Sequence, residues 1–324
     1  MTTDVSGRLS VRVAARREEA KEIASFELVS DDGRALPSFS AGSHIDVRVA
    51  QGLIRQYSLC NAPSETHRYL IAVLKEPTSR GGSKAMHESI QVGDVLSISA
   101  PKNHFPLAHG ATNSLLLAGG IGVTPVLCMA ERLSVIDAPF EMHFCTRSRE
   151  RTAFADRIST SKFACQVHFH FDDGDPSQKF DIASRLATPQ SGTHLYVCGP
   201  KGFMDAVLNA ARTHGWPEEQ LHYEFFAADV QPSENDESFE VKLASSGRTI
   251  VVAKDQTVVQ ALKACGVDVE TSCEQGICGT CVTRVLEGIP DHKDLYFTPD
   301  EHAANDQFTP CCSRSKSPRL VLDL

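Results

Sequence analysis

Hydrophobic and polar positions alternate in short runs along the first hundred residues, and turn residues separate the runs. A period of two is typical of strands that bury one face. Six runs of this kind predict a small antiparallel β-barrel. We expect its strands at Leu9–Val13, Ile23–Leu28, His44–Val49, Gln56–Leu59, Tyr69–Leu74 and Val95–Ser99.

The pattern changes at about Asn113, where continuous apolar runs begin to alternate with helical segments. Leu115–Ala118 precedes a glycine-rich turn and an apolar helix that extends through Leu133. Such repetition of strand and helix predicts a parallel, doubly wound α/β sheet. Further strands are expected at Glu141–Thr146, Gln166–Phe171, Thr193–Cys198 and Leu221–Ala228, and helices at Ala153–Ile158, Ile182–Leu186 and Lys201–His214.

Asp229–Ser238 collects Asp, Glu, Asn, Pro and Ser, which is the composition of a linker. A self-contained segment follows, with short strands, one helix and a cysteine-rich loop. Its elements are expected at Phe239–Leu243, Thr249–Val252, Val258–Cys265, Val282–Leu286 and Leu320–Leu322. The sequence therefore predicts a multidomain protein, with domains at 1–110, 111–228 and 239–324 and a linker at 229–238.

Four of the eleven cysteines follow the spacing C-x4-C-x2-C and then a distant C. This is the plant-type ligand pattern of a [2Fe-2S] cluster. The alternatives are a structural zinc site and four unrelated buried cysteines, but zinc sites usually show two short Cys/His pairs. Gly276 and Gly279 lie within the loop, where a missing Cβ permits unusual backbone dihedrals. The cysteines are Cys273, Cys278, Cys281 and Cys311.

The last of these cysteines has a neighbour, Cys312, that competes for the same role. If this segment is an extended strand, the side chains of Cys311 and Cys312 point to opposite faces. Only one of the two sulfurs can then reach the irons.

Two segments of the barrel suit a phosphorylated aromatic ligand. On an alternating strand Arg55 and Tyr57 share one face, and they offer a cation and an aromatic plane. Gly81, Gly82 and Ser83, with Ser83 as the expected N-cap, begin a helix whose backbone N–H groups suit a phosphate. Together these segments favour a flavin mononucleotide (FMN), whereas the strand alone also fits an ordinary barrel surface.

The glycine-rich turn before the apolar helix suits a pyrophosphate, because only glycine lets phosphates approach the backbone so closely. We expect Thr124 to cap the helix. In a doubly wound sheet the ligand lies beyond the carboxyl ends of the strands, where Thr146 and Cys198 also fall. His168 and His170 could hold a metal, but their spacing on a strand also fits a solvated face.

The composition of the chain argues against several classes of function. A net charge of −9 argues against a nucleic-acid partner. Eleven cysteines in a chain of ordinary core composition fit a reducing compartment better than a disulfide framework. The first residues lack an apolar signal region, and the longest apolar run, broken by glycine and proline, is too short to span a bilayer. We therefore expect a cytoplasmic protein.

Taken in order, these segments resemble the phthalate dioxygenase reductase family, which includes the reductases of vanillate demethylase-type oxygenases. The resemblance covers nearly the whole chain and rests on Arg55–Ser58, residues 80–83, Gly119–Pro125, Cys198–Pro200 and the four cysteines. It implies an FMN barrel, an NADH domain and a plant-type ferredoxin domain of the α+β β-grasp class. It also selects Cys311 as the fourth ligand and leaves Cys312 to packing.

The resemblance implies a role for further residues. Thr124, Cys198 and Phe226 are the candidates for arranging nicotinamide over the flavin, and Phe225 is a second candidate because Glu224–Ala227 departs from the family pattern. Flavin contacts are implied for Arg55, Tyr57, Ser58, Ala72, Val73, Lys75, Gly81, Gly82 and Ser83. Contacts to the nicotinamide nucleotide are implied for Gly120, Thr124, Cys198, Gly199 and Pro200.

The predicted reaction passes electrons from NADH through FMN and the cluster to a terminal oxygenase, a Rieske non-haem iron protein acting on an aromatic acid. The flavin is needed because a hydride carries two electrons and the cluster accepts one. Arg147–Arg151 is basic where an acidic residue would hold the NAD ribose, so NADPH stays open as the donor. Two other functions also stay open: a reductase for another one-electron acceptor such as a cytochrome, and a redox-sensing module.

Overall fold

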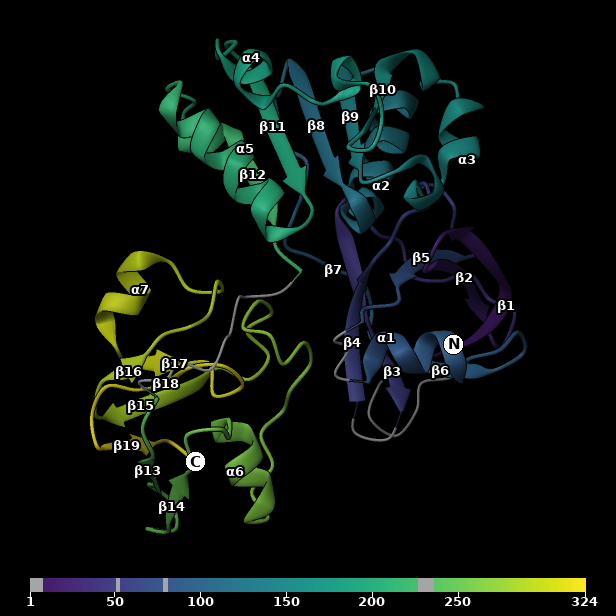
Figure 1. The fold of residues 1–324 in the computed structure, drawn as a ribbon. Helices are drawn as coiled ribbons and strands as arrows, with labels where there is room; N and C mark the ends of the chain where they lie inside the picture. Colours follow the sequence, from purple (N-terminus) through teal and green to yellow (C-terminus); the bar gives the residue numbers. More distant parts are fainter. Residues whose placement is uncertain (1–7, 51–52, 78–80, 227–235) are drawn as a thin grey trace. The chain divides into compact units, whose positions relative to one another are not determined.

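The computed structural model describes residues 8–50, 53–77, 81–226 and 236–324 (Figure 1). The chain divides into two compact units, residues 1–224 and 225–324, and each is described by itself. Most of the predicted linker, together with Arg80 and Ala227, lies outside the described residues.

The first part of unit 1 is the predicted antiparallel barrel. Its strands run in the order β4-β3-β6-β1-β2-β5, with β7 beside β3. The ring closes after β4, where the Cys60 amide donates to the Leu70 carbonyl at 2.9 Å. Val11, Phe26 and Ile45 are among the buried core residues. The elements are β1 (Leu9–Ala20), β2 (Ile23–Ser30), β3 (Ser43–Ala50), β4 (Leu53–Ser58), β5 (Tyr69–Leu74), α1 (Gly82–Glu88), β6 (Val95–Ile98) and β7 (Lys102–Asn103).

The second part of unit 1 is the predicted parallel sheet, with strand order β10-β9-β8-β11-β12. All its pairings are parallel, so the carboxyl ends of the strands meet at one edge. The strands are β8 (Asn113–Gly119), β9 (Phe140–Thr146), β10 (Val167–Phe171), β11 (Thr193–Cys198) and β12 (Leu221–Glu224). The helices are α2 (Val123–Val135), α3 (Ala155–Ser159), α4 (Ile182–Leu186) and α5 (Lys201–Thr213).

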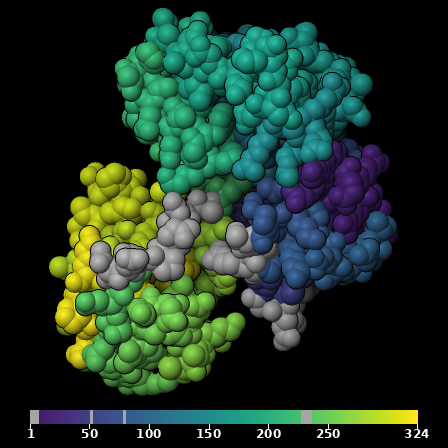
Figure 2. Space-filling model, in the orientation of Figure 1, coloured from purple at the N-terminus to yellow at the C-terminus, as the bar shows by residue number. Residues whose placement is uncertain are grey.

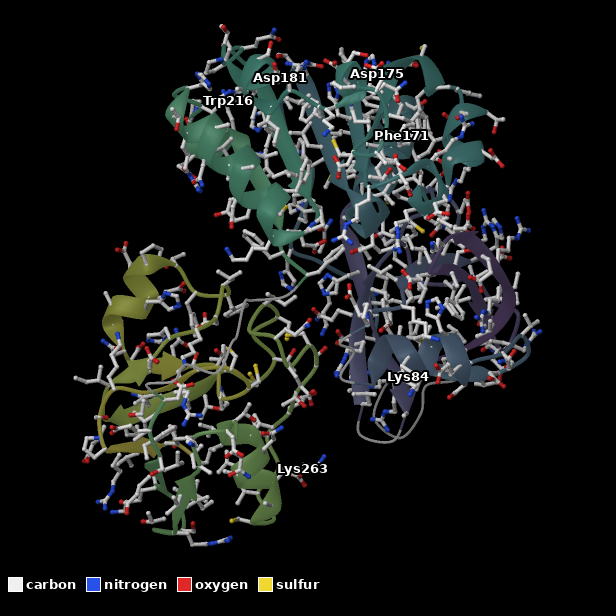
Figure 3. The ribbon with its side chains drawn as sticks, viewed as in Figure 1. Lys84, Phe171, Asp175, Asp181, Trp216 and Lys263 are labelled. Atoms are coloured by element: carbon white, nitrogen blue, oxygen red, sulfur yellow. The ribbon has the colours of Figure 1, made fainter. Side chains whose placement is uncertain are left out.

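The residues of this sheet and its helices, coloured teal to green, pack into one continuous body in the space-filling view (Figure 2). Trp216, labelled in Figure 3, follows α5 and donates from its indole N–H to the Leu186 carbonyl at 3.0 Å. The last strand is shorter than predicted, since it ends at Glu224.

Barrel and sheet are joined at the turn between β1 and β2. The Lys21 amide donates to the Glu150 carbonyl at 2.9 Å, and the Lys21 ammonium lies 3.0 Å from the Glu150 carboxylate. Arg151 donates to Glu22 at 2.7 Å. Two residues of the basic segment considered for a 2′-phosphate are therefore bonded to the barrel.

Unit 2 contains the predicted α+β domain, with strand order β14-β13-β19-β15-β17 and a separate pair, β16 and β18. Thr257 begins α6 with a capping box, and Thr298 does the same for α7. Its strands are β13 (Phe239–Leu243), β14 (Thr249–Val252), β15 (Thr283–Glu287), β16 (Pro290–Asp291), β17 (Gln307–Phe308), β18 (Arg314–Ser315) and β19 (Arg319–Leu322). Its helices are α6 (Val258–Ala264) and α7 (Pro299–Ala304).

Among the described residues, no helix is long and apolar enough to cross a membrane.

Candidate functional site

Arg55 on β4 lies against the start of α1. A Cβ added to Gly82 would come within 2.5 Å of the Arg55 Cγ, so only glycine leaves room for this side chain. Gly81 has φ 93 and is the N-cap, without a side-chain hydrogen bond to the first turn. A cation beside uncapped backbone N–H groups is the arrangement that a phosphate requires.

Ser83 does not cap this helix, and that prediction is wrong. The helix begins two residues earlier because Gly81 adopts the left-handed conformation that glycine tolerates. Ser83 therefore lies in the first turn, where its hydroxyl accepts from the Glu76 amide at 3.1 Å.

Strand β5 contributes apolar side chains that are buried, Ala72 and Val73 among them, and Val73 belongs to the barrel core. The Lys75 ammonium lies 3.0 Å from the Glu88 carboxylate, which makes it half of an exposed ion pair. The Tyr57 hydroxyl is buried and has no hydrogen-bond partner within the part of the chain that the structure describes. Such a group fits a ligand that supplies the missing partner.

The loops after β8 and β11 press against each other at the carboxyl edge of the sheet. A Cβ on Gly122 would lie 2.2 Å from the Cys198 carbonyl oxygen. A Cβ on Gly199 would lie 2.9 Å from the Gly119 Cα. Gly120 has φ 52, and Pro200 is the N-cap of α5. The predicted nucleotide residues are thus brought together at one place.

Thr124 is buried in this region but does not cap α2, contrary to the prediction. A short 3-10 turn at Gly120–Gly122 leads directly into α2, whose N-cap is Gly122. The Thr124 hydroxyl donates instead to the Ile121 carbonyl at 3.1 Å.

Glu224 was not assigned a role from the sequence, yet it connects the two sites. It pairs in register with Cys198 across β11 and β12, and the Ser58 hydroxyl donates to its carboxylate at 3.4 Å. Burial raises the pKa of the Glu224 carboxyl to about 8. Burial also raises the pKa of the Cys198 thiol, and the nearby Glu224 carboxylate raises it further. The available signal was a single acidic residue within the predicted strand Leu221–Ala228.

Phe225 and Phe226 are the first two residues of unit 2. Both side chains are partly buried. Their roles beside the flavin stay predictions.

The four cysteines of the predicted cluster come together in two pairs. Cys273 hydrogen-bonds to Cys278, and Cys311 to Cys281. The Gln275 amide donates to the Cys273 sulfur at 3.3 Å. Paired sulfurs that accept from backbone N–H groups are what a [2Fe-2S] cluster requires.

The two glycines of this loop have the backbone dihedrals that were expected, φ 70 at Gly276 and φ 69 at Gly279. Each also makes room for a neighbour. A Cβ on Gly276 would meet the Cys312 sulfur at 2.6 Å, and one on Gly279 would meet the Tyr296 ring at 2.2 Å. The loop therefore tolerates no side chain at either position.

Cys311 and Cys312 do not lie on an extended strand, so that premise is wrong. They form a turn in which the Cys312 and Ser313 amides both donate to the Thr309 carbonyl, at 3.1 and 2.9 Å. The Cys312 sulfur lies 3.2 Å from the Thr309 hydroxyl. The Cys311 sulfur hydrogen-bonds to both the Cys281 and the Cys312 sulfurs, so the turn keeps Cys312 beside the ligand set, and Cys311 is the one that contacts Cys281.

Comparison with known proteins gives two domain matches and several relatives of full length. Residues 241–316 match the 2Fe-2S iron-sulfur cluster binding domain, and residues 99–221 match the dimethylamine monooxygenase subunit DmmA-like N-terminal domain. A vanillate O-demethylase oxidoreductase of Pseudomonas putida is 56% identical over 96% of this chain and 98% of its own.

Phthalate dioxygenase reductase of Burkholderia cepacia is 37% identical over 100% of this chain and 99% of its own. A solved structure of phthalate dioxygenase reductase, titled a modular structure for electron transfer from pyridine nucleotides to [2Fe-2S], superposes with a TM-score of 0.82. It covers 100% of both chains at 37% identity.

Proposed function

The chain belongs to the phthalate dioxygenase reductase family, and on this basis we propose that it passes electrons from NADH, one at a time, to a Rieske-type oxygenase that acts on an aromatic acid. As a member it is an oxidoreductase, the reductase component of an aromatic oxygenase system, with FMN and a plant-type [2Fe-2S] cluster as cofactors. NADH as the donor and the Rieske class of the partner are part of the proposal.

FMN, when bound, accepts electrons in pairs and releases them singly, which matches a hydride donor to a one-electron centre. The residues of this chain would hold and orient the flavin and the nucleotide. Arg55 and the N–H groups at the start of α1 would bind the FMN phosphate, and the Tyr57 hydroxyl would bond to the flavin. The hydride step needs no side chain as acid or base, so these residues act by position.

The contact between Ser58, Glu224 and Cys198 carries the proposal. Ser58 ends the flavin strand, whereas Cys198 ends a strand of the nucleotide sheet, and Glu224 is bonded to the first and in register with the second. Hydride transfer requires the two ligands to meet at such a point. Thr124 and the Gly199–Pro200 turn would fix the nucleotide against it.

In unit 2 the paired sulfurs support Cys273, Cys278, Cys281 and Cys311 as the cluster ligands. The Thr309 hydroxyl beside Cys312 supports a packing role for that residue. We also propose the boundaries 1–110, 111–228 and 239–324 for the three domains, with a linker at 229–238. Eleven cysteines that form no disulfide support a reducing compartment, and we propose the cytoplasm.

Anaerobic mixing with NADH tests the relay. We expect the flavin absorbance to bleach first and the cluster absorbance afterwards, with a slower or absent reaction for NADPH. A flavin that is reduced while the cluster stays oxidised would show that the relay is wrong.

The acceptor needs a second experiment. Rapid NADH-dependent reduction of cytochrome c would exclude a sensor without turnover. Reconstitution with a purified Rieske oxygenase would then give NADH consumption coupled to product, whereas uncoupled consumption with every such oxygenase would contradict the proposed partner.

A further inference from the structure

The loop after β16 and helix α7 bring three metal-binding side chains together in unit 2. His292, Asp294 and His302 each offer one ligand atom, and these atoms all lie within 4.8 Å of one another. The His302 Nε2 is 3.1 Å from Asp294 Oδ2, and the His292 Nδ1 is 3.7 Å from Asp294 Oδ1. The two imidazole rings are 4.4 Å apart between centroids. This group of residues is separate from the four cysteines assigned to the cluster.

The His292 ring has polar atoms that the fold leaves unsatisfied. Its side chain is 8% exposed, yet neither ring nitrogen has a hydrogen-bond partner among the residues that the structure describes. Asp294 at 3.7 Å is too distant for a hydrogen bond. A buried polar group without a partner is costly, so one that persists implies a ligand that is not a protein side chain.

A second buried histidine has hydrogen-bond partners for both of its ring nitrogens. His143 in the nucleotide sheet has one ring nitrogen 2.9 Å from His170 and the other 2.9 Å from Glu141. Both nitrogens are used, which leaves no lone pair for a metal. His292 differs because its Nδ1 lies 3.7 Å from Asp294 Oδ1, beyond hydrogen-bond distance, while its ring packs 4.4 Å from the His302 ring.

We propose that His292, Asp294 and His302 bind a divalent transition-metal ion, with Zn²⁺ as the preferred one. Two imidazoles and a carboxylate are a usual zinc ligand set, and three protein ligands leave one position for water. The ion has a path to the site because the His302 side chain is 29% exposed.

Asp294 is held in place for this role. Its Oδ1 accepts from the Ser313 hydroxyl at 3.2 Å, and its Oδ2 accepts from the Phe297 amide at 3.0 Å. Such outer bonds orient a ligating carboxylate. The next residue, Leu295, donates its amide to the Gly276 carbonyl at 2.9 Å, so the site is fastened to the cysteine loop. Bound zinc therefore stabilises the loop without taking part in electron transfer.

Zinc titration of the holoprotein tests the site. The full chain with its flavin and cluster is dialysed against a mild chelator, and Zn²⁺ is then titrated in competition with a chromogenic chelator. We expect one tight site per chain in the wild type. The variant His302→Gln should weaken that site at least about 100-fold, since even the loss of an outer partner costs 10–100-fold. The matched variant His109→Gln, which changes an exposed histidine, should keep it.

Two results would overturn the proposal. One is equal zinc affinity in the wild type and His302→Gln, provided that both show the same visible cluster spectrum and are therefore folded. The other is zinc uptake that removes the cluster absorbance in both proteins, because the ion would then occupy the cysteines.

Thermal loss of the cluster absorbance gives an independent readout. Zinc should raise its midpoint in the wild type and in His109→Gln, but not in His302→Gln, because a ligand that binds only the folded state stabilises it. No rise in the wild type would show that the site does not support the loop. Neither the zinc titration nor the thermal measurement uses NADH. A negative result for the zinc site is therefore distinct from failure of the proposed function.

Discussion

Replacing Glu224 with Gln removes a carboxyl whose pKa is much higher in the folded protein than in the unfolded chain. Burial raises that pKa from 4.5 to about 8. A rise of about 3.5 pKa units, at about 1.4 kcal/mol per unit, amounts to roughly 5 kcal/mol of lost stability. This figure is an upper limit, since the side chain is partly exposed. The neutral Gln avoids this cost.

The sign follows from proton binding. Below pH 4.5 the carboxyl is neutral in both states and contributes no difference. As the pH rises towards 8, the unfolded chain releases the proton while the folded chain keeps it, so the wild type loses stability relative to Glu224→Gln. The difference is roughly 2 kcal/mol at pH 6 and reaches its limit above pH 8.

Infrared difference spectroscopy measures this carboxyl directly. At pH 7 the wild type should show a protonated carboxylic acid band that disappears as the pH passes through about 8 and that is missing in Glu224→Gln. Urea midpoints from pH 5 to 9 should diverge in the stated direction. The variant Glu219→Gln, at an exposed position, should follow the wild type. A missing band together with parallel pH profiles would refute the assignment.

Three further predictions concern the cysteine loop and the nucleotide loop. Cys312→Ser should keep the visible cluster spectrum, whereas Cys311→Ser should lose it. Gly279→Ala should lower cluster occupancy, because its Cβ would lie 2.2 Å from the Tyr296 ring, and Tyr296→Ala in the same chain should restore it. Gly122→Ala should raise the KM for NADH at least several-fold in steady-state assays, because its Cβ would lie 2.2 Å from the carbonyl of the adjoining loop.

Controls separate these effects from general damage. Gly202→Ala on α5 meets nothing within 4 Å and should leave the KM for NADH unchanged. Loss of the spectrum in Cys312→Ser would mean that the wrong sulfur was chosen. Failure of Tyr296→Ala to restore the cluster would point to the positive φ of Gly279, rather than the contact, as the constraint.

The sequence predicted the strands well because their alternation is local. All three predicted sheets appear where expected, and β1 continues to Ala20, but the two-residue strands β7, β16, β17 and β18 were not predicted. The helix starts were predicted less well. Ser83 and Thr124 have the side chains that favour an N-cap, but Gly81 and Gly122 take that position. A glycine can begin a helix through backbone geometry alone, and residue preference does not reveal this.

The contacts that assemble the site span too much sequence for local reasoning. Ser58 and Glu224 are 166 positions apart, and no pattern within either segment predicts that they bond. The cysteine spacing, in contrast, encodes its own geometry, because three ligands lie within one loop. Only the surroundings of Cys312 needed the structure, since the turn depends on the Thr309 carbonyl.

The meeting point of the two cofactor sites has little net charge, and this bears on its chemistry. Burial keeps the Cys198 thiol neutral, and a pKa of about 8 keeps most of Glu224 protonated at pH 7. A fixed charge in such a place would act strongly on a reacting nicotinamide and flavin, because buried surroundings screen it only weakly. A protonated Glu224 can accept from Ser58 and also donate through its own O–H. The site is therefore built to align two rings in neutral surroundings, and acid–base catalysis is not what its geometry provides.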